Sequence, residues 1–160
     1  MASRTLEHPE IQKLAQFGVA AAQVEPFDVL FLPENLMNVS RRQDLLDSED
    51  SIDLAKRLKE EGIACATSYD LTPEAAIVQR GGGDLWLGTI WIMRPEAVNR
   101  TANVLSRKLK SWLRRNDGRG MVHLQVRIRG ETGVAEFGYV GDGLTLRSLL
   151  RGLQAGEKRM

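Results

Sequence analysis

The stretch Leu85-Trp86-Leu87-Gly88-Thr89-Ile90-Trp91-Ile92-Met93 is the longest apolar run in the sequence. It does not alternate between apolar and polar residues, which is typical of a strand that is covered on both faces. Pro95 follows and predicts the start of the longest helix, which extends to about Asn116 with apolar residues every three or four positions. We therefore expect a central strand followed directly by a long amphipathic helix.

The residues after this helix alternate with a period of two, which predicts a strand from Val122 to Arg129. Its apolar members are Val122, Leu124, Val126 and Ile128, and its polar members are His123, Gln125, Arg127 and Arg129. The sequence Gly130-Glu131-Thr132-Gly133 predicts a hairpin turn, and residues 134–140 predict the returning antiparallel strand. Asp142-Gly143 then leads into a final helix that contains four leucines between Leu146 and Leu153.

The first half of the chain predicts a strand–helix–strand unit. A helix over residues 8–23 precedes a short strand from Phe27 to Leu32. A second helix is expected to start near Ser48 or Asp50 and to end before Gly62, and a strand over residues 63–67 follows. Thr72-Pro73-Glu74 favours the start of a short helix, although residues 75–80 are also compatible with a strand.

These elements predict an α/β or α+β fold with a single mixed sheet of about five strands, ordered β-α-β and then β-α-β-β-α, with flanking helices. The 160 residues, of which 42% are hydrophobic and 27% charged, are typical of one globular domain, with a soft sub-boundary near residues 80–84. The chain has one cysteine, no apolar run of about 20 residues and no apolar segment at its N-terminus. We expect a cytoplasmic, reducing location and no membrane contact.

Charge is distributed unevenly along the chain, although the net charge is only +1. Nine basic residues and one acid, Asp117, lie between residues 100 and 129. The nine are Arg100, Arg107, Lys108, Lys110, Arg114, Arg115, Arg119, Arg127 and Arg129. We expect them to form one basic face on the helix and hairpin, unless they are only a solvated helix surface. Five acids lie between Gln43 and Leu54.

The basic face favours a small non-catalytic interaction or regulatory subunit that docks onto an acidic protein or onto a second copy of itself as a homo-oligomer. Nucleic-acid binding through the same residues is an alternative, although only Trp112 among the aromatic residues lies between them. A small enzyme that acts on a phosphorylated ligand is a further alternative. Its ligand loop would contain Asp70, Gly81, Gly82, Gly83 and Asp84, near Ser68–Asp70 and Gly81–Asp84.

The sequence contains no Walker lysine motif, no Gly-x-Ser-x-Gly, no His-Glu-x-x-His and no Rossmann glycine fingerprint, so we expect no catalytic residue, no metal and no cofactor. Asp84-Leu85-Trp86 follows the glycines where a phosphate loop has Lys-Ser/Thr, which favours a flexible turn. Cys65 lies between two alanines and is typical of a buried small residue. His8 and His123 are the only histidines, and neither belongs to a recognisable motif.

The C-terminal third resembles a known family in three successive segments. These are Leu109-Lys110-Ser111-Trp112-Leu113-Arg114-Arg115, the basic strand and hairpin from Val122, and the helix with Leu146–Leu153. Together they resemble small accessory proteins of bacterial conflict systems, of the effector-associated constant component type, over roughly residues 95–154. The resemblance implies a non-catalytic component that acts with an effector or protease partner in defence. It carries no catalytic residue over to this chain, and it does not include the first 80 residues.

Overall fold

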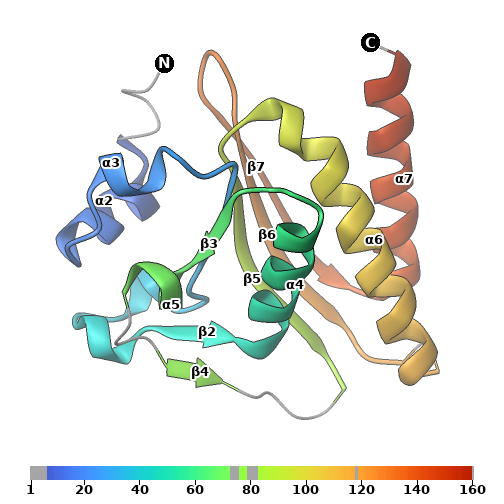
Figure 1. Cartoon of the computed structure of the whole chain (residues 1–160). Helices are drawn as coiled ribbons and strands as arrows, with labels where there is room; N and C mark the ends of the chain where they lie inside the picture. Colours follow the sequence, from blue (N-terminus) through green and yellow to red (C-terminus); the bar gives the residue numbers. More distant parts are fainter. Residues whose placement is uncertain (1–6, 73–75, 79–82, 118, 160) are drawn as a thin grey trace.

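A computed structural model shows a mixed α/β fold (Figure 1). It describes residues 7–72, 76–78, 83–117 and 119–159, and for residues 152–159 it describes only the backbone. The main sheet has five strands in the order β3-β1-β5-β6-β7. They are β1 (Val29–Leu32), β3 (Cys65–Thr67), β5 (Leu85–Ile92), β6 (Val122–Arg129) and β7 (Val134–Gly141). The β1–β3 and β5–β6 pairs are parallel, whereas β1–β5 and β6–β7 are antiparallel. The predicted mixed sheet of about five strands is confirmed as the main sheet of the fold.

Helices lie on both faces of this sheet (Figure 1). One face packs against α4 (Glu49–Glu60), α6 (Val98–Arg115) and α7 (Gly143–Arg159). The other face packs against α2 (Pro9–Gln16) and α3 (Ala21–Val24) at the β1 and β5 end. We call these the α6 face and the α2 face.

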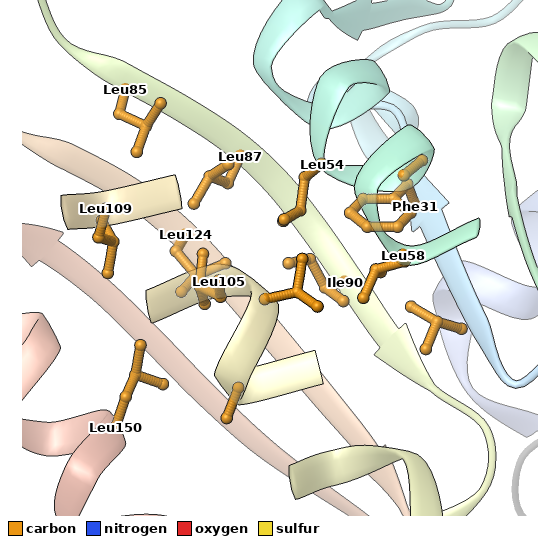
Figure 2. Close-up of a cluster of buried hydrophobic side chains, with 14 of the residues drawn as sticks. Phe31, Leu54, Leu58, Leu85, Leu87, Ile90, Leu105, Leu109, Leu124 and Leu150 are labelled. Carbon is orange, nitrogen blue, oxygen red and sulfur yellow. The ribbon is translucent and has the colours of Figure 1, made fainter. Parts of the chain in front are cut away.

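The central strand β5 is covered on both faces, as its continuous apolar sequence predicts. Figure 2 shows Leu85, Leu87 and Ile90 directed toward α4 and α6, together with Leu54, Leu105 and Leu109. Trp91 is fully buried on the α2 face. The pairing of β5 with β6 shifts between Trp86 and Gly88, and Gly88 has a φ of +64°. This bulge changes the alternation of the strand, so that Leu87 and Ile90 both reach the α6 face.

The predicted helix over residues 8–23 is two helices, because the chain reverses at Gly18. Its φ is +87°, a left-handed conformation that an L-residue with a side chain adopts at a cost. The amide of Val19 donates to the carbonyl of Leu14, which closes the end of α2. By contrast, Ser48 caps α4 as expected, and Gly62 follows it with a φ of +84°.

A second sheet of two parallel strands, β2 (Leu46–Ser48) and β4 (Ala76–Val78), was not predicted as a pair. Strand β4 confirms the strand alternative for part of residues 75–80. The short helix expected from Thr72 is replaced by β4 at Ala76–Val78, and α5 (Ser68–Leu71), which Thr67 caps, ends just before Thr72. Residues 73–75 and 79–82 lie outside the described ranges. Three short 3-10 segments complete the fold: η1 (Leu36–Asn38), η2 (Arg42–Asp44) and η3 (Pro95–Ala97).

Candidate functional site

The nine basic residues do not form one face. The apolar side of β6 packs toward α6, so its polar side points away from that helix, onto the α2 face. There the Nε of Arg127 lies 3.1 Å from the Oε1 of Glu10, and the Nη1 of Arg129 lies 3.0 Å from Glu25. The sheet therefore separates the hairpin cations from the helix cations, and the predicted common basic face is wrong.

Three helix cations are bound to α4 and the residue that follows it. The Nζ of Lys108 lies 2.6 Å from Asp53, and the Lys108 side chain is only 3% exposed. Arg107 forms an ion pair of 2.6 Å with Glu61, and Arg100 donates to the backbone carbonyl of Glu61. Burial raises the pKa of Asp53, but hydrogen bonds from Lys108 and Arg57 outweigh it and lower the pKa overall. We call this set of contacts the α4–α6 clasp.

The acidic segment from Gln43 to Leu54 is also largely used within the chain. Asp44 pairs with Arg41 at 3.0 Å, and Asp50 accepts a hydrogen bond from the backbone amide of Trp86 at 2.9 Å. Asp47 is buried and accepts from the Ser68 hydroxyl and from the Tyr69 amide. Burial raises the pKa of Asp47. Most of this segment is therefore occupied by intrachain partners, which leaves few of its acids to contact the basic residues of a second copy.

Four cations remain at the C-terminal end of α6 and just after it. They are Lys110, Arg114, Arg115 and Arg119, which we call the basic end. All four are exposed, and within residues 7–72, 76–78, 83–117 and 119–151 none of them pairs with a carboxylate. Arg114 and Arg115 occupy the last turn of α6, where a positive charge also stabilises the helix dipole. Trp112 is buried, so no aromatic ring is exposed within the basic end.

Asp70 and Asp84 of the predicted ligand loop have separate structural roles. The Asp70 carboxylate accepts from the amide and hydroxyl of Thr67 and pairs with Lys59 at 3.4 Å, which fixes the start of α5. Asp84 accepts from the Met121 amide at 2.9 Å and lies 3.1 Å from the Nε2 of His123. These hydrogen bonds lower the pKa of Asp84. Gly83 has a φ of +83°, and Gly81 and Gly82 lie outside the described residues.

Asp84 lies beside a cleft on the α2 face that the sequence did not predict, since its partner His123 is one of the residues that line this cleft. The rings of Trp86 and His123 are stacked, with centroids 3.7 Å apart and an interplanar angle of 1°. The cleft is about 300 Å³ and is also lined by Asn35 and Val140. His123 hydrogen bonds to Asp84 and, within the described chain, to no serine, threonine or cysteine side chain. The pair therefore lacks an activated nucleophile.

Cys65 is buried, and its thiol donates to the backbone carbonyl of Ala55. Burial raises the pKa of this thiol to about 11, which disfavours the reactive thiolate. Among the described residues, no three histidine, cysteine or acidic side chains gather as metal ligands would. Within the same ranges, none of the helices combines the length and the apolar composition that a bilayer crossing requires.

An apolar pocket on the α6 face is the other feature that the sequence did not predict. Its volume is about 390 Å³, and it lies between α6, α7 and strands β5, β6 and β7. Of the side chains that the structure describes, twelve apolar ones and Thr101 line it. A stripe of leucines on a final helix normally indicates core packing, so the pattern alone gives no sign that the packing is incomplete.

Comparison of this chain with protein-family models, with curated proteins and with solved structures gave no match.

Proposed function

We propose that this protein is a non-enzymatic interaction module that docks an acidic surface of a partner protein onto the basic end of α6. One observation carries the proposal. Five of the nine basic residues are held by groups of the same chain, whereas Lys110, Arg114, Arg115 and Arg119 are exposed and have no carboxylate partner among the described residues.

The chemistry of the basic end favours a protein partner over single-stranded nucleic acid and over a second copy of this chain. Four cations without an exposed aromatic ring offer little to unstacked bases. A second copy of the chain has few free acids in the segment from Gln43 to Leu54, because Asp44, Asp47, Asp50 and Asp53 already have partners. An accessory role beside an effector or protease in bacterial defence, as the family resemblance implies, is the specific form of this proposal.

A proposal of this kind predicts binding that depends on charge and on salt. Exposed charges at the rim of an interface mainly set the rate and the specificity of association, and salt screens them. A duplex of DNA bound through the same four cations would lose affinity with a log–log salt slope of about −4 at most.

The test measures the fluorescence anisotropy of a labelled polyglutamate peptide and of a DNA duplex of equal charge at low and physiological salt. The variant Arg114→Glu/Arg115→Glu is expected to lose peptide binding. The control Lys56→Glu changes an exposed lysine on α4 and should keep it. Tighter binding of the duplex than of the peptide would replace the protein partner with nucleic acid.

Light scattering at low and high salt tests whether the chain binds a second copy of itself. A monomer at both salt concentrations agrees with a separate protein partner. A salt-sensitive dimer that Arg114→Glu/Arg115→Glu dissociates would identify the basic end as a contact between copies and would overturn the proposal. Absence of binding to both probes at low salt would also overturn it.

A further inference from the structure

The pocket on the α6 face has the properties of a ligand site, independently of the basic end. Its volume of about 390 Å³ is more than twice that of the apolar cavities of about 150 Å³ that take up benzene. It also exceeds the lower limit of about 300 Å³ for small-molecule pockets. Ile90, Leu105, Leu124 and Leu150, which Figure 2 labels, come from four different elements and form part of its wall.

The pocket opens at two apolar side chains. Phe137 of β7 is 41% exposed and Leu149 of α7 is 49% exposed, and both belong to the lining. These residues give an apolar molecule a route from solvent to the interior between α7 and the sheet. The wall on the α6 side is formed by Val98, Thr101, Ala102 and Leu105.

Among the described lining residues, one side chain is polar. Thr101 is 3% exposed, and its hydroxyl has no hydrogen-bond partner among the described residues. A buried hydroxyl without a partner is costly, so nearly all such groups in folded proteins are satisfied by protein, water or a ligand. The Thr101 hydroxyl can both donate and accept, so it can bind either an alcohol or a carbonyl group.

Among the residues that the structure describes, the lining contains no ionisable side chain. A carboxylate or an ammonium group inside this pocket would lose its hydration without gaining an opposite charge. The ligand must therefore be neutral where it enters the pocket.

We propose that this pocket binds a neutral apolar molecule larger than benzene that presents one hydroxyl or carbonyl group to Thr101. Medium-chain alcohols are the simplest members of this class. This binding is separate from the acidic partner, because the basic end contributes no residue to the pocket.

The first experiment follows the fluorescence of N-phenyl-1-naphthylamine, a neutral apolar probe, and its displacement by decanol. The intact chain is expected to bind the probe saturably and to release it to decanol. Val126→Phe fills the pocket from β6 and should abolish binding, whereas Val140→Phe, on the α2 face of β7, should leave it unchanged. If Val126→Phe does not fold, Ala102→Leu fills the pocket from α6. Equal binding by the pocket variant and by Val140→Phe would overturn the proposal, as would no saturable binding by the intact chain.

The second experiment tests the hydroxyl. Thr101→Val keeps the shape of the side chain. We expect it to lower the affinity for decanol about fivefold relative to the affinity for decane, because one net hydrogen bond is lost. An unchanged ratio would remove Thr101 from the assignment. Light scattering provides the last outcome, since a dimer that Val126→Phe dissociates would show that a second copy covers the pocket.

Discussion

Within the α4–α6 clasp, we predict that Lys108 and Asp53 respond unequally to substitution. The Lys108 side chain is 3% exposed, whereas that of Asp53 is 45% exposed, and their charged atoms are 2.6 Å apart. Asp53→Asn leaves a buried ammonium without its counter-charge. Such a loss costs about 3–5 kcal/mol for a fully buried pair, and the exposure of Asp53 reduces this to about 2 kcal/mol. Lys108→Met removes the buried charge and keeps the volume, so it should change stability by less than about 1 kcal/mol.

Urea denaturation of the two single variants and of the double variant measures this asymmetry. Adding Lys108→Met to Asp53→Asn should restore most of the lost free energy of unfolding, with an unchanged dependence on urea concentration. The melting temperature of Asp53→Asn should fall by about 4–8 °C. Arg57→Met is the matched control, because Arg57 contacts the same carboxylate at 3.0 Å on the surface and should cost less than about 0.5 kcal/mol.

The result that refutes this reasoning is a Lys108→Met variant that loses as much stability as Asp53→Asn.

The pH dependence of stability gives a second check. Because the pKa of Asp53 is lowered by folding, its contribution to stability is present above the pKa of the unfolded chain and is lost as the pH falls through the folded value. Lys108→Met removes one of the hydrogen bonds responsible, so it should flatten the loss of stability in this acid range.

Three further variants or reactions test other parts of the structure. Gly120→Ala should destabilise the fold by more than about 2 kcal/mol, since φ is +90° and a Cβ would lie 2.6 Å from the carbonyl oxygen of Gly83; an unchanged urea midpoint would contradict this. Trp91→Phe should cost about 1–2 kcal/mol, because it leaves a void and removes the 3.0 Å bond from the indole to Glu10, and thermal melting reports it. Cys65 should react with a thiol reagent at mildly alkaline pH at least about a hundredfold more slowly in the native than in the unfolded chain, as a pKa raised from 9.0 to about 11 predicts; similar rates would show that the thiol is accessible.

The sequence predicts the main sheet well, because its longer strands have strong local signals. Strand β6 alternates with a period of two, and β5 is continuously apolar between turn residues. The two short strands β2 and β4 have three residues each, too few for a period to be recognised. The break at Gly18 depends on one backbone angle, which a helical pattern on both sides conceals.

The basic face was predicted wrongly for a geometric reason. Two amphipathic elements that pack through their apolar sides must point their polar sides in opposite directions. Helix α6 and strand β6 meet in this way at Leu105 and Leu124, so Arg114 and Arg127 lie on opposite sides of the sheet. Counting charges along the chain therefore overestimates how many of them share one surface. The pocket and the Trp86–His123 stack depend on long-range packing and leave no local pattern in the sequence.

The position of β1 has a consequence for how the chain can be divided. This strand comes from the first half of the sequence, yet it pairs with β5 from the second half at four positions, while α4 is joined to α6 by the clasp. A cut between β4 and β5 would give two fragments that each expose the hydrogen-bonding edge and apolar surface required by the other. Such fragments have the complementarity needed for a split reporter whose halves regain structure only when they meet.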